Sequence, residues 1–377
     1  MTIYLDNAAT SFPKAPGLGA AVADFIENNS RSVGRGGSDA SEKMTAETRR
    51  LVCSLLHFDA AERVIFTSGA TMSVNMLLRG LLRSGDHVVT TQMEHHAVLR
   101  PLYLLDGVDV TVVPAAADGR VDADALEAAV RPETRLIILS HASNVCGTVL
   151  PVREAAEIAR RHGAYIAIDC AQTAGVLDID AKEFDFVAFA GHKGLMGPQG
   201  IGGFTLSAPL AQELRPHFAG GTGTYSHLHE MPPELPSRFE PGTPNLPGIA
   251  GLRHSLRFIL GEGTQKIQAR ETELTRRLLD GLRELPVTVH GIGDTKYIGD
   301  TKHRTSVISF TSPYSDNRVL AQVLEKNGVE LRFGLHCAPS AHEALGTRET
   351  GTIRISPGYF TAGEEIDEFV SLLGRLL

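Results

Sequence analysis

Short apolar runs alternate with helical patterns along the first two thirds of the chain. The runs, rich in Val, Ile and Phe, lie at residues 63–67, 87–91, 111–114, 136–140, 165–169, 186–190 and 201–206. Between them, apolar residues recur at helical spacing over 122–130 and 152–162. This alternation predicts an α/β domain whose sheet is largely parallel and covered by helices on both faces.

A proline-rich stretch interrupts this pattern between residues 232 and 247. Its prolines are Pro232, Pro233, Pro236, Pro241, Pro244 and Pro247. Proline at this density prevents a regular helix or a central strand. We therefore predict a large domain over 15–248 and a small α+β domain formed by 1–14 with 249–377. The small domain is expected to contain a long amphipathic helix, strands near 307–310, 329–332 and 352–355, and a final helix.

Charge and cysteine content restrict the class of function. Lys and Arg number 36 against 44 Asp and Glu, a formal net charge of −8, which argues against nucleic acid or an anionic membrane as the partner. The four cysteines lack CxxC spacing and are too few for a disulfide framework, which favours a reducing cytoplasm. The N-terminus lacks the apolar run of a signal peptide, and no stretch is long and apolar enough for a membrane span.

Two residues at strand ends suggest a cofactor. Asp169 ends the apolar run 165–169, where open α/β sheets bind their ligands, and Lys193 follows the run 186–190 within a glycine-rich loop. Taken singly, Asp169 could be a helix N-cap and Lys193 a surface lysine. Pyridoxal phosphate needs both groups, because a lysine amine forms its Schiff base and a carboxylate keeps its ring nitrogen protonated. The pair therefore predicts this cofactor.

Residues 68–71, with the sequence SGAT, supply a possible phosphate site. They lie between a predicted strand and a predicted helix, where backbone N–H groups and the helix dipole favour an anion. Small residues also simply close turns of this kind, so the segment gains its meaning only beside Asp169 and Lys193.

Nine segments, in order from end to end, resemble a known enzyme family. They are DNAAT (6–10), TSGAT (67–71), MEHHA (93–97), SNVCGT (143–148), DCAQTAG (169–175), GHKGLMGPQGIG (191–202), FEPGTPN (239–245), RFGLHCAP (332–339) and TIRIS (352–356). Together they look like class V aminotransferase-family enzymes, and specifically like the second, SufS-like group of cysteine desulfurases. The resemblance implies a pyridoxal phosphate-dependent transferase of fold type I, with a mostly parallel seven-stranded sheet in its large domain.

The same resemblance implies roles for individual residues at the cofactor. Lys193 carries pyridoxal phosphate as a Schiff base, Asp169 pairs with the ring nitrogen, and His95 stacks on the ring. The other cofactor-binding residues that it implies are Asn144 and Gln172 at the ring hydroxyl, and Ala70, Thr71, His192 and the partner subunit's Thr243 at the phosphate. A homodimer follows from the last of these.

At the substrate, the resemblance implies that Arg354 binds the carboxylate, with Asn7 as a second substrate-binding residue. A guanidinium suits a carboxylate because it can bind both oxygens at once. Cys337 is implied as the nucleophile, which takes sulfur from L-cysteine as a persulfide, leaves L-alanine and passes the sulfur to a protein or thiol acceptor. A neighbouring imidazole, His336, would favour the Cys337 thiolate if protonated.

Several of these residues also have ordinary structural interpretations. His95 could be a polar residue at a strand end, Asn144 a turn former, and Arg354 a solvent-facing residue of an edge strand. Arg332 has no assigned ligand. The remaining cysteines, at positions 53, 146 and 170, are expected to be packing residues.

The chain also departs from the family pattern. Ala190 stands where relatives carry a hydroxyl residue before Gly-His-Lys, so one phosphate contact is missing. Residues 35–38 read RGGS rather than Arg-Gly-x-His, and Met72 stands where the relatives often have an acid.

Two other functions compete with a cysteine desulfurase. The first is a selenocysteine lyase or another class V reaction that does not use Cys337. The second is a non-catalytic partner protein that keeps the fold. Retention of Lys193 and Asp169 together with Cys337 argues against the second.

Overall fold

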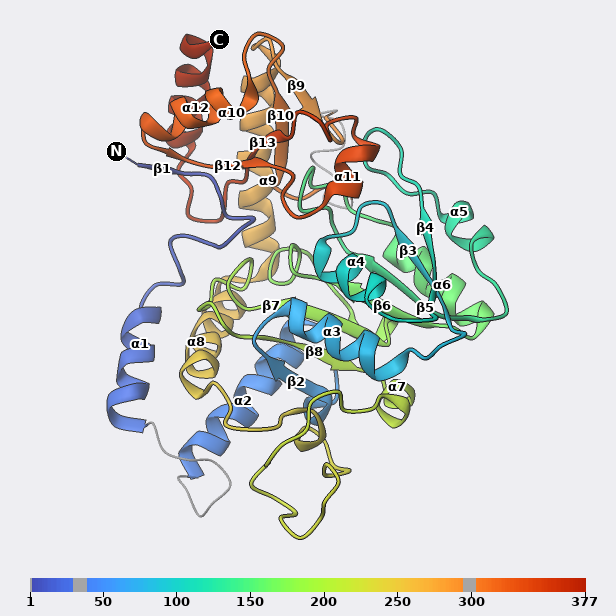
Figure 1. Cartoon of the computed structure of the whole chain (residues 1–377). Coiled ribbons are helices and arrows are strands. Elements are labelled where there is room, and N and C mark those ends of the chain that lie inside the picture. Colours follow the sequence, from blue (N-terminus) through green and yellow to red (C-terminus); the bar gives the residue numbers. More distant parts are fainter. Residues whose placement is uncertain (1, 30–38, 294–302) are drawn as a thin grey trace.

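The computed structural model describes residues 2–29, 39–293 and 303–377. A seven-stranded sheet forms the centre of its larger part (Figure 1). In spatial order the strands are β2 (Val64–Thr67), β8 (Gly202–Leu206), β7 (Phe186–Ala190), β6 (Tyr165–Asp169), β5 (Thr134–Ser140), β3 (His87–Thr91) and β4 (Asp109–Val113). Strand β8 runs antiparallel to both of its neighbours, β2 and β7, and the remaining pairs of this sheet are parallel. The predicted α/β fold with a mostly parallel sheet is therefore confirmed.

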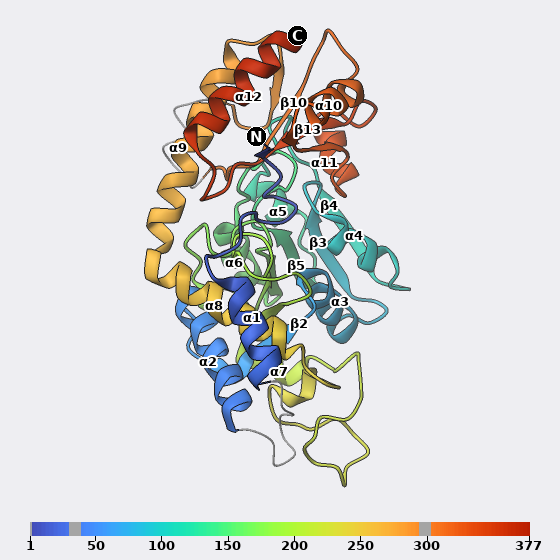
Figure 2. The ribbon, with the colours of Figure 1, turned by 90° about the vertical axis from the view of Figure 1, so that its left-hand side faces the viewer.

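Both faces of this sheet are buried because successive side chains point to opposite sides. In β5, Ile137 and Leu139 belong to one apolar cluster, whereas Leu136 and Ile138 belong to the other. The first cluster is completed by α2 (Asp39–Leu55), α6 (Val152–His162) and α8 (Leu246–Glu262), and the second by α3 (Ala70–Leu81), α4 (His96–Tyr103) and α7 (Ala208–Glu213). Figure 2 shows α3 and α4 on one side of the sheet and α2 and α8 on the other. This double coverage explains why the strands read as continuous apolar runs.

The C-terminal part forms a smaller α+β unit. Its antiparallel sheet has the order β12 (Arg332–Gly334), β13 (Thr352–Ile355), β10 (Ile308–Thr311) and β9 (Thr288–His290). The helices α9 (Thr264–Arg283), α10 (Asn317–Lys326) and α12 (Gly363–Leu376) pack on it through a third apolar cluster. The N-terminal strand β1 (Ile3–Tyr4) joins the same unit by pairing in parallel with β11 (Val329–Glu330).

The division into 15–248 and 1–14 with 249–377 stays a prediction. Within the described chain, the buried residues of α8, such as Leu252 and Leu256, pack with the large sheet, whereas those of α9 from Leu274 onward pack in the small cluster. The short helices α1 (Leu18–Asp24) and α5 (Ala123–Ala128) lie at the surface of the large unit. The short helix α11 (Pro339–Ala344) packs against the apolar cluster of the large unit. The family departure at 35–38 lies outside the described residues.

Candidate active site

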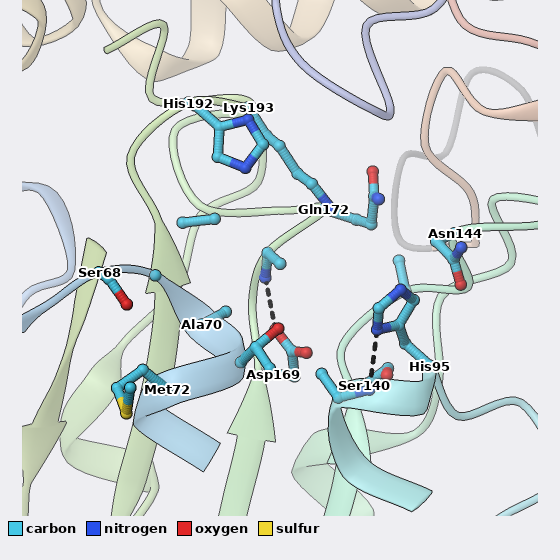
Figure 3. Close-up of a pocket in the computed structure, with 16 residues that line it drawn as sticks. Ser68, Ala70, Met72, His95, Ser140, Asn144, Asp169, Gln172, His192 and Lys193 are labelled. Atoms are coloured by element: carbon cyan, nitrogen blue, oxygen red, sulfur yellow. Dashed lines mark hydrogen bonds between the residues drawn. The ribbon is translucent and has the colours of Figure 1, made fainter. Parts of the chain in front are cut away.

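A cavity of about 190 Å³ opens at the carboxyl ends of the central strands. Ser140 ends β5, Asp169 ends β6 and Ala190 ends β7, and all three residues line the cavity. The other lining residues are Ser68, Gly69, Ala70, Thr71, Met72, His95, Ala97, Ala142, Asn144, Ala171, Gln172, His192 and Lys193. The structure therefore brings together eight of the predicted cofactor residues, and Figure 3 shows how they surround the space.

Asp169 lies at the base of this cavity. Its side chain is 6% exposed, and its Oδ1 accepts a hydrogen bond from the backbone N–H of Ala171 (2.9 Å). This contact closes a turn, and no helix starts there, so the interpretation of Asp169 as a helix N-cap is wrong. Burial raises the pKa of the Asp169 carboxyl. A buried carboxylate is stabilised by a cationic partner, which a protonated ring nitrogen would provide.

Lys193 lies in the turn that follows β7, and its side chain extends into the cavity toward Gln172 (Figure 3). The lysine is only partly exposed, so the surface interpretation is wrong. Burial lowers the pKa of its amine to about 8, although the charge of Asp169 acts in the opposite direction. An amine with this pKa is neutral in a useful fraction near neutral pH, which a nucleophile or general base requires.

The predicted phosphate end is formed where β2 leads into α3. Gly69, the residue before α3, has φ +151°, a conformation that favours glycine, and a Cβ on Gly202 would approach Gly69 Cα to 2.7 Å. The backbone N–H groups of Ala70 and Thr71 begin the 12-residue helix α3 at this edge of the cavity. The segment thus has the geometry of an anion site at a helix N-terminus.

His95 and Asn144 lie at the opposite end of the cavity (Figure 3). His95 caps α4, because its Nδ1 accepts a hydrogen bond from the backbone N–H of Ala97 (3.0 Å). Burial, followed by the charge of Lys193, lowers the pKa of the His95 imidazole to about 4, so the ring is neutral with its proton on Nε2. Asn144 Nδ2 donates to the backbone carbonyl of His336 (2.7 Å).

The cavity contains polar atoms without partners in the described chain. Asn144 Oδ1 and His192 Nδ1 are buried and make no hydrogen bond among the described residues. Buried polar atoms are rarely left unpaired, so these two fit a bound group with polar substituents at both ends. Together with Asp169 and Lys193, they fit pyridoxal phosphate.

The side chains of Gln172 and Asn7, both predicted to contact a ligand, form hydrogen bonds with the backbone of the chain. Gln172 Nε2 donates to the carbonyl of Ala8 (3.1 Å). Asn7 Nδ2 donates to the carbonyl of Ser356 (3.0 Å), while its Oδ1 accepts from the N–H of Phe12 (3.1 Å). Asn7 lines a second, smaller cavity that also touches Gln172 and Lys193. The ligand contacts of both residues stay predictions.

Arg354 is a buried cation on β13, between β12 and β10. It is 3% exposed, so the solvent-facing interpretation is wrong. Its Nη2 forms an ion pair with Asp6 Oδ1 (2.7 Å), and its Nη1 donates to the carbonyl of Asn144 (3.0 Å). Arg354 Nε is buried without a partner in the described chain, and Arg332 stands directly opposite Arg354 in the sheet register. The guanidinium is thus fixed in place with its Nε unpartnered, and Arg354 does not itself line the cavity of Asp169 and Lys193.

Cys337 lies in the loop between β12 and α11, next to the cavity. Its carbonyl accepts from the backbone N–H of His96 (2.8 Å), which begins α4 directly after His95. Cys337 is exposed, whereas the cysteines at positions 53, 146 and 170 are buried, as expected for packing residues. Cys337 and His336 both have positive φ, 59° and 49°, and this conformation costs non-glycine residues roughly 1–2 kcal/mol each.

The protonation state of His336 decides whether it can favour the Cys337 thiolate, which requires an imidazolium. The residue is 5% exposed. Burial lowers the pKa of His336 well below its ordinary value, and the charge of Arg354 adds to the effect. The imidazole is therefore neutral at pH 7 and supplies no charge to the thiol.

Thr243 does not line this cavity. It is exposed and borders a larger groove of about 1100 Å³, which shares Ser68 and Met72 with the cavity. Its predicted role toward a second subunit's phosphate stays a prediction. Ala190 does line the cavity, so the missing hydroxyl is a difference at the site itself.

The comparison with known families agrees with this geometry. The family model for aminotransferase class-V matches residues 3–369. The chain belongs to this family. Because the match covers nearly the whole chain, the family predicted from the nine segments is confirmed, while the SufS-like subgroup stays a prediction.

Individual class-V relatives carry a more specific name. The chain is 35% identical, over all of its length and 94% of the relative, to a probable cysteine desulfurase of Methanothermobacter thermautotrophicus. It is similar to the apo structure of a cysteine desulfurase from Thermococcus onnurineus, with a TM-score of 0.91 and 30% identity over 100% of this chain and 94% of that one. A cysteine desulfurase structure from Escherichia coli matches with a TM-score of 0.87 and 26% identity, over 99% and 94% of the two chains.

Three residues of this class-V site were not singled out by sequence reasoning. Lys14 Nζ donates to the carbonyl of His192 (2.9 Å) and so connects the N-terminal segment to the turn that carries Lys193. Glu94 is fully buried and accepts from both the N–H and the hydroxyl of Ser140 at the end of β5 (2.8 and 2.7 Å). Asp6 holds Arg354. Asp6 and Glu94 stand within two of the quoted segments, and that position was the available signal.

Two features are absent from the described residues. No cluster of three or more His, Cys, Asp or Glu side chains suited to a metal ion occurs among them. Within the same ranges, no helix is long and apolar enough to cross a membrane.

Proposed function

We propose that this class-V protein is a pyridoxal phosphate-dependent cysteine desulfurase, which converts L-cysteine to L-alanine and takes up the sulfur on Cys337. The observation that carries the proposal is the arrangement of Asp169 and Lys193 around one cavity, with the exposed Cys337 in a loop bonded to that cavity's Asn144 through His336. The names of the relatives support the same activity.

The cofactor would be held by residues from three strand ends. Asp169 would pair with the ring nitrogen, His95 would lie against the ring, and the N-terminus of α3 would bind the phosphate. When bound, pyridoxal phosphate supplies an electron sink for negative charge at the substrate Cα. Asp169 favours this chemistry because its carboxylate stabilises a protonated ring nitrogen.

Lys193 has two tasks in this proposal. Its amine would hold the cofactor covalently, and the same amine would move the proton at the substrate Cα as a general base. A pKa of about 8 suits both tasks, since the neutral amine is the reactive form.

Arg354 would orient the substrate. Its ion pair with Asp6 and its bond to the Asn144 carbonyl fix the guanidinium beside that cavity residue. A guanidinium held in advance loses little conformational freedom when the substrate binds.

Cys337 would accept the sulfur. Its thiolate attacks the substrate sulfur, the bond between that sulfur and the substrate Cβ breaks, and a proton takes the place of sulfur at Cβ. The products are alanine and a persulfide on Cys337. A protein or thiol acceptor then takes the outer sulfur of this persulfide and leaves Cys337 as a thiol. The segment 332–339 supports placement in the SufS-like group.

The proposal extends to assembly and compartment. A homodimer would place the partner subunit's Thr243 at the phosphate, supported by the groove that Thr243 borders and that joins the cavity at Ser68. In gel filtration we expect a dimer, and Thr243→Ala should bind pyridoxal phosphate more weakly. Four free cysteines, three of them buried, support work in a reducing cytoplasm.

The test is turnover of L-cysteine by the cofactor-loaded protein. We expect stoichiometric alanine and sulfane sulfur and a visible absorption band from bound pyridoxal phosphate. A faster reaction with selenocysteine that proceeds without Cys337 would favour a selenocysteine lyase. A colourless protein after addition of cofactor would favour a non-catalytic partner protein.

A further inference from the structure

The nucleophile's loop adopts a turn that its sequence does not favour. The N–H of Ala338 donates to the carbonyl of Leu335 (2.9 Å), and the two residues between them have φ values of 49° and 59°. Positive φ at both central positions is the pattern of a type I′ turn, which prefers Asn-Gly. Here the positions hold His336 and Cys337. Residues held in such a conformation persist only where the surroundings fix them, and they cluster at functional sites.

The backbone of this turn is held at both central carbonyls. Asn144 Nδ2 donates to the His336 carbonyl (2.7 Å), and the N–H of His96 donates to the Cys337 carbonyl (2.8 Å). Both donors come from the large unit, beside the cavity, whereas the turn follows strand β12 of the small unit. The turn is therefore tied across the two units at the point where the thiol must meet its substrate.

The side chain of His336 provides a second anchor. A chain of hydrogen bonds runs from its Nε2 to Thr352 Oγ1 (3.0 Å), on to Ser309 Oγ (3.1 Å) and to the carbonyl of Val145 (2.6 Å). A carbonyl can only accept, so Ser309 must donate to it, Thr352 must donate to Ser309, and His336 must donate to Thr352. The proton of the neutral imidazole is therefore on Nε2.

Both anchors end on neighbouring residues of one segment. The carbonyl of His336 binds Asn144, and the ring of His336 is linked through two hydroxyls to Val145. His336 is 5% exposed and Thr352 is fully buried, whereas Cys337, the residue after His336, is exposed. The turn thus points the imidazole inward and leaves the thiol outside, at a position fixed relative to Asn144 and the cavity.

We propose that His336 is a positioning residue, whose Nε2–H bond to Thr352 holds the left-handed turn so that the Cys337 thiol reaches the substrate sulfur. This inference rests on the proposed function for the identity of the reaction. His336 does not line the cofactor cavity, so in this proposal it acts through the backbone of Cys337.

Matched variants of two buried threonines test the proposal. Thr352→Val keeps the shape of the side chain and removes the hydroxyl that accepts from His336, while Thr352→Ser keeps the hydroxyl. Thr347→Val is the control, because Thr347 Oγ1 bonds to His342 Nδ1 (2.8 Å) instead, and both threonines are almost fully buried. Each cofactor-loaded variant is assayed for kcat and KM with L-cysteine and for amide hydrogen exchange of residues 335–338.

For Thr352→Val we expect kcat to fall about 5- to 10-fold, as loss of one buried hydrogen bond implies, with KM for L-cysteine unchanged. Exchange of the turn's amides should accelerate by a similar factor. Thr352→Ser and Thr347→Val should match wild type in both measurements. Equal losses of kcat in Thr352→Val and Thr347→Val, or unchanged exchange in Thr352→Val, would overturn the positioning role.

The two readouts separate this inference from the proposed function. If wild type forms no alanine from L-cysteine while Thr352→Val still loosens the turn, the proposed function fails and the anchored turn stands. If wild type forms alanine and Thr352→Val equals it in kcat and exchange, the function stands and the positioning role of His336 fails.

Discussion

The cofactor cavity and the Cys337 turn obtain their geometry in different ways. Asp169 ends one regular strand of a doubly covered sheet and Lys193 follows the next, and Asp169 is buried while Lys193 is only partly exposed. Cys337 is exposed, in an unfavourable backbone conformation, and hydrogen bonds from the other unit hold it there. The cavity thus works through burial and altered pKa values, whereas the turn works through position. Changes in the first should affect the chemistry of the cofactor, and changes in the second only sulfur transfer.

The largest expected effect is at Lys193. In Lys193→Ala we expect alanine formation to fall by about 10³-fold or more, because the variant loses both the covalent attachment of the cofactor and the general base. The absorption band of covalently bound pyridoxal phosphate should disappear. Lys182→Ala, at an exposed lysine, is the control and should resemble wild type. Retained turnover in Lys193→Ala would place the chemistry elsewhere.

Arg354→Lys tests the proposed ligand of the substrate carboxylate. We expect KM for L-cysteine to rise about 10- to 100-fold, because lysine cannot both keep the bonds to Asp6 and Asn144 and bind a carboxylate. The cofactor band should remain. Steady-state kinetics beside the surface variant Arg131→Lys measure the difference. A KM equal to that of wild type would exclude Arg354 as the carboxylate ligand.

The last expected effect is the pH dependence of the rate at which Lys193 attaches the cofactor. This dependence distinguishes a lysine with a lowered pKa from one with an ordinary pKa. Burial lowers the pKa of Lys193 to about 8, and only the neutral amine attaches the cofactor. As pH rises from 6, the neutral fraction grows about tenfold per unit and then levels off near pH 8. Stopped-flow absorbance of apo-protein mixed with pyridoxal phosphate gives the attachment rate. A rate that keeps rising to pH 10 would mean that the amine is not desolvated.

Regular elements were predictable from sequence where the apolar pattern was unambiguous. The strands β3, β6, β7 and β13 and the helix α6 occupy the predicted residues. The strand β1 was not predicted, because two residues carry no periodicity and their pairing with β11 depends on contacts more than 300 positions away. Residues from 249 onward were assigned to the small domain, but the buried residues of α8 pack with the large sheet, since an amphipathic helix after a proline-rich stretch can cover either unit.

The site, too, contains residues that the sequence could predict and properties that it could not. Asp169 and Lys193 were predicted from the strand ends, because parallel strands bring their carboxyl ends to one edge of a sheet. Residues such as His95, Asn144 and His192 were predicted only from the family resemblance, and they line the same cavity. The neutral state of His336 and the ion pair of Arg354 with Asp6 depend on burial and on contacts between the two units. Neither the burial nor these contacts can be derived from the local sequence, so the sequence left the charge of the imidazole beside Cys337 open.

The central claim is that the sulfur of L-cysteine moves to Cys337. The most direct measurement is mass spectrometry of the protein after a single turnover with ³⁴S-labelled L-cysteine, for wild type, Cys337→Ser and Cys53→Ser. Burial raises the pKa of the Cys53 thiol to about 11, so Cys53 should stay unreactive. We predict one labelled sulfur on the peptide containing Cys337 in wild type and in Cys53→Ser, and none in Cys337→Ser, whose alanine formation falls to background. Alanine formed by Cys337→Ser at the wild-type rate would contradict the account.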